Sequence, residues 1–284
     1  MKASVKYLAI FRQKDKYPIT VMCRFFDVSR SGYYEYVKRM DIPTRDKDLA
    51  KVIAQCQNLV RNTYGYRRMH IWLMQQGIYR NPKTVLRVMH KYGLLAQIRR
   101  RRKYRHMSEH LHKYPNLLNR NFVADYPNQK WVTDISYIHT GQGVLYLSMI
   151  RDLYDNSIIG YKTGTEQSIG LVLDTVRYAV SKEKVTAELQ LHSDQGFQYT
   201  SRAYNILTKE YGITQSMSRR ANCYDNAMAE NFFSILKAEC IYRQKIHSFI
   251  QARELIDDYI WFYNNERIQL KTKLTPLEKR RQAM

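Results

Sequence analysis

The spacing of hydrophobic positions changes after Tyr126-Pro127-Asn128, from a helical period to the short runs typical of strands. Three runs rich in aromatic and β-branched residues follow one another at Trp131–His139, Val144–Asp152 and Ser157–Thr163. Gly141-Gln142-Gly143 predicts a tight turn between the first two. Because the connections are short, we expect these three strands to pair antiparallel.

Helices and strands alternate through the rest of the chain. Ile169, Val172 and Val176 recur at helical spacing. The pattern then predicts, in order, a strand at Ala187–His192, a helix at Arg202–Tyr211, a strand at Ile213–Met217, and helices at Asp225–Ile241 and Phe249–Tyr263. Three strands followed by alternating helices and strands indicate the α/β class, with a mixed sheet and helices on both of its faces.

Two helical hairpins precede this sheet. In Tyr17–Arg39 we expect two short helices, with Ser29 capping the second. In Gly65–Leu95 one helix runs to about Gln76, and Asn81-Pro82 opens the next. Both hairpins have the length and composition of a helix-turn-helix, so α-helical DNA-binding segments precede the α/β unit.

The second hairpin carries basic side chains away from its apolar stripe, namely Arg67, Arg68, Lys83, Arg87 and Lys91. A solvated helix face is the plain alternative for one such helix. Two basic hairpins in succession favour contact with DNA.

Charge is distributed unevenly along the chain. The net charge is +22, yet residues 1–120 hold 27 basic and 7 acidic side chains, whereas residues 121–284 hold 20 and 18. The consecutive residues Arg99, Arg100, Arg101, Arg102 and Lys103 repel one another, so we expect this run to stay extended until phosphates neutralise it. A nuclear-import signal is the competing interpretation of the run. The asymmetry indicates a polyanion-binding arm joined to a unit with another task.

These patterns divide the chain into five parts. We expect a first helix-turn-helix-like segment at 1–45, a second at 46–97, a basic linker at 98–125, an α/β core at 126–245, and a C-terminal helix and tail at 246–284.

Several classes of protein are excluded. Cys23, Cys56, Cys223 and Cys240 form no CxxC pair, which argues against a cysteine zinc knuckle and a dense disulfide framework. No apolar run reaches the roughly 20 residues of a membrane span, and the N-terminus carries no secretory signal. We therefore expect a cytoplasmic protein that meets nucleic acid and no membrane.

Three carboxylates occupy unusual places in the near-neutral half. Asp134 lies in the middle of an apolar strand, Asp194 directly follows the strand ELQLH, and Glu230 lies in the helix that begins at Asp225. At about 100° per residue, Glu230 and Lys237 share the helix face opposite the apolar stripe, roughly 10 Å apart. Asp152, Asp155, Asp174 and Asp225 are interpreted as turn, surface or cap residues.

Two aspartates and a glutamate suit magnesium chemistry. Mg²⁺ prefers oxygen ligands, and two such ions about 4 Å apart can activate an attacking oxygen and stabilise the leaving one at a phosphodiester. The three carboxylates supply enough charge for two ions, so we expect Mg²⁺, with Mn²⁺ as a substitute.

The blocks WVTDISYI, LHSDQGFQYTS and YDNAMAENFFSILKAE, in this order, closely resemble the catalytic blocks of bacterial insertion-sequence transposases of the IS-three type, relatives of retroviral integrases. The 35 residues between Asp194 and Glu230 match the family's interval, and Lys237 lies where the family carries a basic residue. YGYRRMHIWL and NPKTVLRVMHKYGLL resemble its upstream helix-turn-helix block, and YNNERIQLKTKLTPLEKR its closing motif.

The resemblance implies a ribonuclease-H-like core in which Asp134, Asp194 and Glu230 are catalytic metal ligands and Lys237 contacts DNA near the cleaved phosphate. It further implies that a set of block residues supports the ligands or contacts DNA: His192, Ser193, Gln198, Tyr199, Asn222 and Asn226. The implied activity is Mg²⁺-dependent end cleavage and strand transfer of an insertion sequence. The implied partners are element and target DNA, further copies of the chain, and the product of an upstream reading frame, at the bacterial nucleoid.

Two other functions remain open at this point. A DNA-binding regulator of the same fold would bind DNA without cutting it. A tyrosine recombinase would use one of the 24 tyrosines as a nucleophile, but the sequence offers no arginine and histidine cluster around such a tyrosine.

Overall fold

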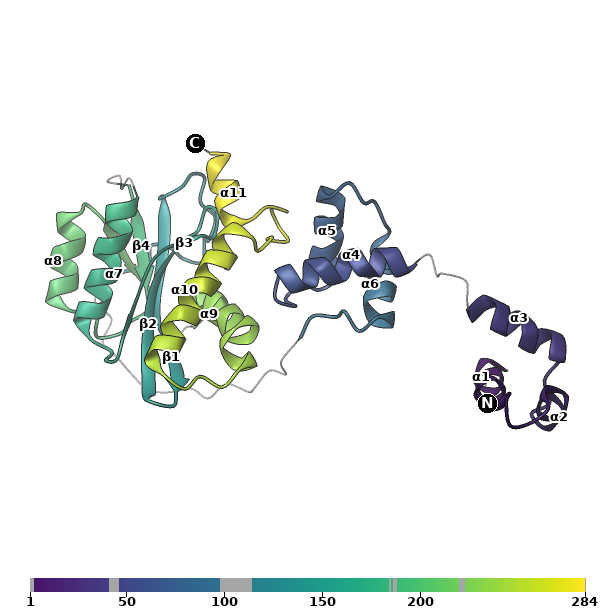
Figure 1. The fold of residues 1–284 in the computed structure, drawn as a ribbon. Coiled ribbons are helices and arrows are strands. Elements are labelled where there is room, and N and C mark those ends of the chain that lie inside the picture. Colours follow the sequence, from purple (N-terminus) through teal and green to yellow (C-terminus); the bar gives the residue numbers. More distant parts are fainter. Residues whose placement is uncertain are drawn as a thin grey trace.

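The computed structural model describes residues 3–40, 46–97, 114–183, 185, 188–219 and 223–283. It contains three parts in a row, which are the N-terminal helices α1–α3, a helical unit α4–α6, and a sheet-containing core with the C-terminal helices (Figure 1). The basic run Arg99–Lys103 lies outside the described residues.

The N-terminal part is a small helical unit with its own core. Its helices are α1 (Ala3–Gln13), α2 (Ile19–Phe25) and α3 (Arg30–Met40). Ile10, Met22 and Tyr33 are buried between them. Ser29 accepts a hydrogen bond from the backbone N–H of Gly32 at 3.1 Å, which confirms its predicted capping role.

The second helical unit contains α4 (Asp46–Leu59), α5 (Tyr66–Gln75) and α6 (Pro82–Lys91). The Asn81 side chain caps α6 by accepting from the N–H of Lys83, as the sequence predicts. Gly77 ends the turn after α5 with a φ of 74°, a conformation that glycine adopts readily. The helices α1 and α4 were not predicted, although Ile53 and Cys56 of α4 recur at helical spacing.

A mixed five-stranded sheet forms the core, in the order β3-β2-β1-β4-β5. Its strands are β1 (Lys130–Thr140), β2 (Gly143–Asp152), β3 (Ile158–Gly164), β4 (Gln190–Ser193) and β5 (Thr214–Met217). The first three pair antiparallel, as predicted, and β4 and β5 run parallel to β1. This arrangement confirms the mixed α/β sheet of a ribonuclease-H-like core.

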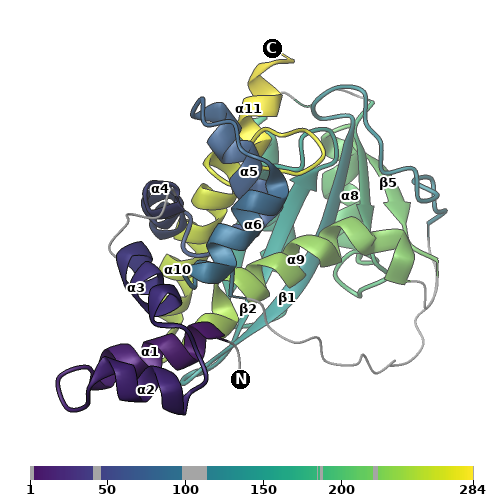
Figure 2. The same ribbon diagram turned by 90° about the vertical axis from the view of Figure 1, so that its right-hand side faces the viewer.

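Helices cover both faces of the sheet (Figures 1 and 2). One face packs against α7 (Ile169–Lys182) and α8 (Arg202–Glu210). The other packs against α9 (Ala227–Glu239) and α10 (Phe249–Asn265), and α11 (Pro276–Arg281) follows. The predicted helix Asp225–Ile241 is divided, because short 3₁₀ turns at Cys223–Asn226 and Ile241–Arg243 flank α9.

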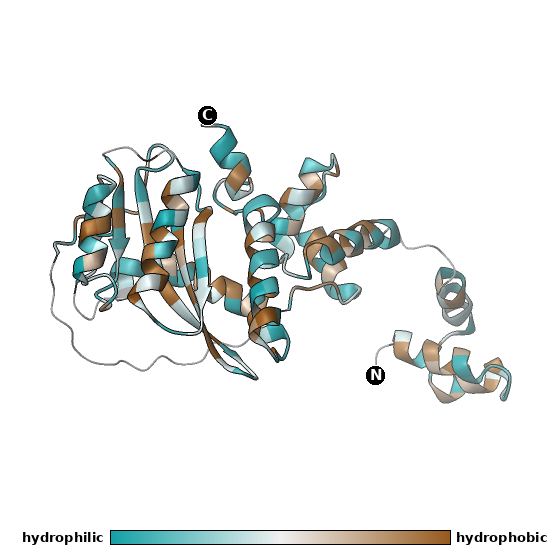
Figure 3. Cartoon of the chain, turned by 60° about the vertical axis from the view of Figure 1, so that its left-hand side comes forward, coloured by the Kyte–Doolittle hydropathy of each residue, from teal (hydrophilic) through white to brown (hydrophobic). Residues whose placement is uncertain are grey.

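The helical unit α4–α6 shares its hydrophobic core with α9 and α10. The Tyr64 hydroxyl donates to the carbonyl of Glu266 at 2.8 Å and accepts from the N–H of Ile268 at 2.9 Å. In Figure 3 the helices carry apolar and polar stripes, consistent with burial of one side of each. Among the helices of the described ranges, none has both the length and the apolar composition to cross a membrane.

Candidate active site

The strand pairing places Asp134 and Asp194 side by side. β1 and β4 are parallel, with Val132 opposite His192, and β4 ends at Ser193. Asp134 lies two residues after Val132 and Asp194 two residues after His192, so they occupy matching positions, at the carboxyl end of β4 and midway along the longer β1. This is the edge at which open α/β sheets bind ligands.

Backbone donors orient both aspartates. The N–H of Ile135 donates to Oδ1 of Asp134 at 2.7 Å, and the N–H of Gly196 donates to Oδ1 of Asp194 at 2.9 Å. A Cβ on Gly196 would lie 3.0 Å from that same Oδ1. The turn can wrap this closely around the Asp194 carboxylate because residue 196 has no side chain.

Glu230 reaches the site from the first turn of α9. The buried residues Arg151 and Asn226 hold this turn against the sheet. Nη1 of Arg151, on β2, donates to the carbonyl of Met228 at 2.6 Å. The Asn226 side chain donates to the carbonyl of Thr133, beside Asp134, at 3.3 Å. Arg151 was not among the predicted site residues, although an arginine within the apolar strand VLYLSMIRD was a usable signal.

The three carboxylates and Lys237 lie within reach of one another's charge. Burial raises the pKa of Asp134 well above its usual range, and the charges of Asp194 and then Glu230 raise it further. Burial and Asp194 likewise raise the pKa of Glu230. Burial lowers the pKa of Lys237, and the charge of Asp134 opposes that shift. Mutually repelling carboxylates of this kind favour the binding of a cation.

The carboxylates do not form a closed cage. Within the described ranges, no group of three or more His, Cys, Asp or Glu side chains has an arrangement that could hold a metal ion as it stands. The donors are hard oxygens, the type that Mg²⁺ prefers, and Mg²⁺ keeps several waters when it binds through few protein ligands. The chemistry of the donors therefore fits the ion, whereas the cluster is open.

Most of the other block residues are buried supports. The His192 ring lies 2.8 Å from Oγ of Ser216 and 3.1 Å from Oγ of Ser218, and burial lowers its pKa to about 4. The Tyr199 hydroxyl lies 3.3 Å from Oγ1 of Thr133. Five of the residues expected to support ligands or contact DNA are buried and so lack a surface for DNA: His192, Ser193, Gln198, Tyr199 and Asn226. Asn222 lies outside the described residues.

Asp225 is a buried ion-pair partner and not a simple cap or turn residue. Its carboxylate accepts from Arg219 at 3.0 Å, from Arg120 at 2.9 Å and from Asn116 at 2.8 Å. These contacts tie the segment before the sheet to the 3₁₀ turn that leads into α9. They thereby help to place Glu230, which lies in the first turn of α9, directly after that 3₁₀ turn.

Asp152 and Asp155 also form a buried cluster. Both accept from Nη1 of Arg280 on α11, at 3.0 and 2.7 Å, and Arg280 also pairs with Glu183. Asp174 is exposed and pairs with Arg177 at 3.0 Å, as expected of a surface residue.

The chain matches integrase-core family models and is similar in sequence to insertion-sequence transposases. Residues 124–223 and 230–284 match two models of the integrase core domain, and residues 44–102 match the HTH-like domain. The transposase InsK of insertion sequence element IS150 from Escherichia coli K12 is 38% identical over 268 residues, 94% of this chain and 95% of InsK. InsF, a transposase of insertion sequence IS3A from the same organism, is 34% identical over 266 residues, 90% of this chain and 91% of InsF. The chain belongs to the IS-three family of insertion-sequence transposases.

The catalytic core domain of HTLV-2 integrase, solved in complex with magnesium, aligns with this transposase at a TM-score of 0.45 and 13% identity. The alignment covers 55% of this chain and 98% of that domain.

The predicted DNA contacts of the transposase fall into two groups. Arg67 and Lys83 are exposed on α5 and α6. Arg68 is partly buried and donates to the carbonyl of Ile268 at 2.9 Å, and Arg87 makes a two-pronged ion pair with Asp46 at 2.7 and 2.9 Å. Nε of Arg67 also donates, to the hydroxyl of the adjacent Tyr66 at 3.2 Å, whereas Arg68 and Arg87 pair with residues far away in the chain.

Proposed function

We propose that this transposase cuts the ends of its insertion sequence and joins them to target DNA in a Mg²⁺-dependent reaction. Asp134, Asp194 and Glu230 are the metal ligands and catalytic residues. The observation that carries the proposal is that Asp134 of β1 and Asp194 after β4 hold matching positions on parallel strands, with Glu230 and Lys237 of α9 near enough for their charges to act on Asp134. Membership in a transposase family supports it.

The metal requirement follows from the donor set. When bound, Mg²⁺, or Mn²⁺ in its place, supplies Lewis-acid chemistry at a phosphodiester, and three carboxylates together with a DNA phosphate would balance the charge of two ions. Asp134 and Asp194 bring one oriented oxygen each, and the open cluster leaves space for a DNA phosphate to complete the coordination.

Lys237 and the basic surface hold the DNA. We assign Lys237 to a phosphate next to the cleaved bond, because its charge already interacts with Asp134. Arg67 and Lys83 are exposed and stay proposed phosphate contacts, together with the run Arg99–Lys103. Arg68 and Arg87 are assigned to the protein fold instead.

The active assembly contains at least two copies of the chain on DNA, since transposition joins two ends. A product of an upstream reading frame is a further proposed partner in recognising those ends. The proposed reaction takes place in the bacterial cytoplasm, at the nucleoid.

Labelled DNA carrying the element ends tests the proposal, with Mg²⁺, Mn²⁺ or a chelator. Wild type should give cleaved and joined products with either metal and none with the chelator. Glu230→Gln and Asp134→Asn should reduce both products by more than about 100-fold, because each removes a metal-binding charge. DNA affinity should stay the same or rise in Asp134→Asn, since a negative charge near phosphate is lost.

Matched controls are Glu254→Gln on the exposed face of α10 and Asp174→Asn on α7, which should leave both products unchanged. Binding without metal-dependent products, even after the upstream product is added, would contradict the proposal and indicate a DNA-binding regulator. A protein–DNA adduct that survives denaturant would contradict it too, because it would reveal a tyrosine nucleophile.

A further inference from the structure

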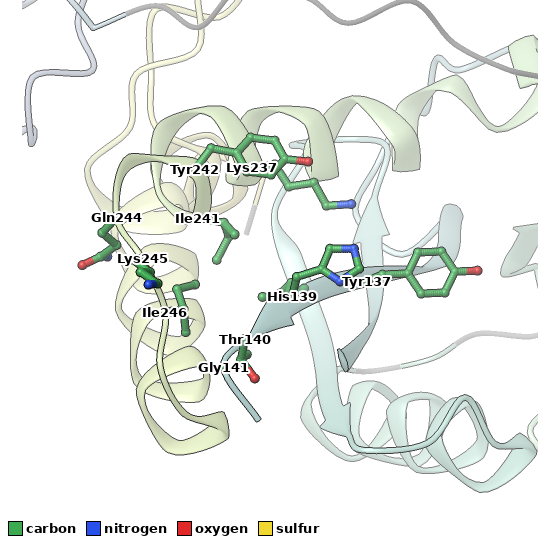
Figure 4. A pocket seen from close by; sticks show the side chains of 11 residues that line it. Tyr137, His139, Thr140, Gly141, Lys237, Ile241, Tyr242, Gln244, Lys245 and Ile246 are labelled. Carbon is green, nitrogen blue, oxygen red and sulfur yellow. The ribbon is translucent and has the colours of Figure 1, made fainter. Parts of the chain in front are cut away.

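A hollow of about 620 Å³ opens beside the proposed active site, and Lys237 belongs to both (Figure 4). One wall is the second half of β1, with Tyr137 and His139, and the other is the segment that follows α9, with Tyr242 and Lys245. Buried isoleucines, among them Ile241, form part of the lining.

The hollow exists because β1 is longer than its neighbour. The pairing of β4 with β1 stops at Val132, so the later residues of β1 have no strand beside them on that side. The N–H of Gly141 donates to the carbonyl of Ile246 at 2.9 Å, and a Cβ on Gly141 would lie 2.8 Å from the carbonyl oxygen of His247. The two walls are thus joined at one end by close backbone contact.

The lining combines aromatic rings with positive charge. Tyr137 is 47% exposed and Tyr242 is 52% exposed, which are large fractions for aromatic side chains. An edge-on contact with Tyr146, at a centroid distance of 5.6 Å, holds the Tyr137 ring. Among the described residues that line the hollow none is acidic, whereas Lys237 and Lys245 are basic.

Aromatic faces beside lysines are the chemistry that binds single-stranded nucleic acid. Bases stack on the rings, while the cations meet the phosphates. In a duplex both faces of an internal base are covered by its neighbours, so only an unpaired or extruded base can stack on a tyrosine.

We propose that this hollow is a subsite for an unpaired nucleotide of the DNA strand that enters the active site, with the base stacked on Tyr242 and its phosphate at Lys245. The inference rests on the proposed function, because Lys237 links the hollow to the carboxylates. It adds to that function a preference for DNA whose strands are separated next to the cut.

Binding of the full-length chain to fluorescent DNA tests the subsite, in chelator and at one fixed salt concentration. The probes are a 30-base-pair duplex with blunt ends and the same duplex with three unpaired adenines added to a 5′ end or to a 3′ end. A stacked base contributes about 5- to 150-fold in affinity, so wild type should prefer at least one extended duplex by a factor in that range. Tyr242→Ala should lose most of this preference and keep its affinity for the blunt duplex, whereas Tyr242→Phe should retain the preference.

An abasic extension, which keeps the phosphates and lacks the bases, separates stacking from charge. It should lower the affinity of wild type to that of Tyr242→Ala and leave Tyr242→Ala unaffected. Equal binding of wild type to blunt and extended duplexes, or a preference that persists without bases, would overturn the proposal. The abasic comparison needs only wild type, so it decides the question even if a variant fails to fold.

The outcomes also separate the subsite from the catalytic proposal. Binding in chelator requires no chemistry, so a stacking preference without cleavage would leave the subsite standing and remove the catalytic proposal. Cleavage without a stacking preference would remove the subsite and leave the catalytic proposal standing.

Discussion

At the scale of single residues, the ionisation of Asp225 decides how firmly the approach to α9 is held. Its carboxylate is fully buried and accepts from Arg219 and Arg120, which are themselves about half exposed. The hydrogen bond from Arg219 holds the pKa of Asp225 well below its usual range, against the opposing effect of burial. The charged form is therefore the one that stabilises the fold.

We predict that Asp225→Asn lowers the free energy of unfolding by about 1.5–3 kcal/mol at pH 7, the range for hydrogen bonds to charged groups. A carboxyl with a lowered pKa contributes stability above its unfolded pKa of about 3.9, and this contribution is lost as the pH falls through the folded pKa. The difference between wild type and variant, measured by urea unfolding, should be constant from pH 7 to about 5 and shrink below about pH 4.

His192 titrates in the same window, because burial lowers its pKa to about 4 and Asp225 opposes that shift. The difference between wild type and variant therefore reports Asp225 together with its effect on His192. A difference that grows on acidification would contradict the assigned sign.

At the scale of elements, close packing of α7 on β3 depends on Gly160. A Cβ on Gly160 would lie 2.8 Å from Cβ of Ala179 and 3.2 Å from its Cα. Both residues lie in the middle of regular elements that the hydrophobic pattern predicts. The hydrophobic pattern predicts β3 and α7 but not the distance between them, because that distance depends on the sizes of residues 160 and 179 together.

We predict that Gly160→Ala lowers the free energy of unfolding by about 1–3 kcal/mol through overpacking. Adding Ala179→Gly should recover part of this loss, although glycine within a helix itself costs roughly 1 kcal/mol. Chemical denaturation of the two single variants and the double variant would measure the coupling.

Gly65→Ala is the matched control, since Gly65 has a φ of −72° and a Cβ there would meet nothing within 4 Å. Strict additivity of Gly160→Ala and Ala179→Gly would show that the two positions do not compete for the same space.

At the scale of the whole molecule, side chains of the helix-turn-helix-like unit bind backbone groups of the catalytic core and so fix the two parts together. The buried hydroxyl of Tyr64 bridges the carbonyl of Glu266 and the N–H of Ile268, and Arg68 donates to the carbonyl of Ile268. Arg243 donates in the other direction, to the carbonyl of Arg61 at 2.6 Å. If α5 and α6 bind DNA as proposed, these contacts would hold the bound segment in a defined position relative to the carboxylates.

We predict that Tyr64→Phe lowers the free energy of unfolding by about 1–3 kcal/mol, because it leaves the buried N–H of Ile268 and the partly buried carbonyl of Glu266 without their partner. Tyr79→Phe, at a side chain that is 71% exposed, should change it by less than about 0.5 kcal/mol. Thermal or urea unfolding measures both variants. Equal effects of the two substitutions would show that the bridge between the units contributes no stability.

The sequence alone predicts the strands, the main helices, the caps at Ser29 and Asn81, and the order of the acidic blocks. These features are local, since hydrophobic period, turn residues and capping side chains act over a few positions. The proposal for Asp134, Asp194 and Glu230 was also accessible, because a carboxylate in an apolar strand or at its end is costly without a purpose.

Which charged side chains have partners depends on how the chain packs in three dimensions. Arg120 and Asp225 are 105 residues apart, and Arg280 lies 128 residues from Asp152. The hollow at Tyr137 and Tyr242 likewise joins the end of β1 to the segment after α9. Such pairings depend on how the sheet and its helices pack, and no local pattern records them, because chain folding brings together positions that are independent in sequence.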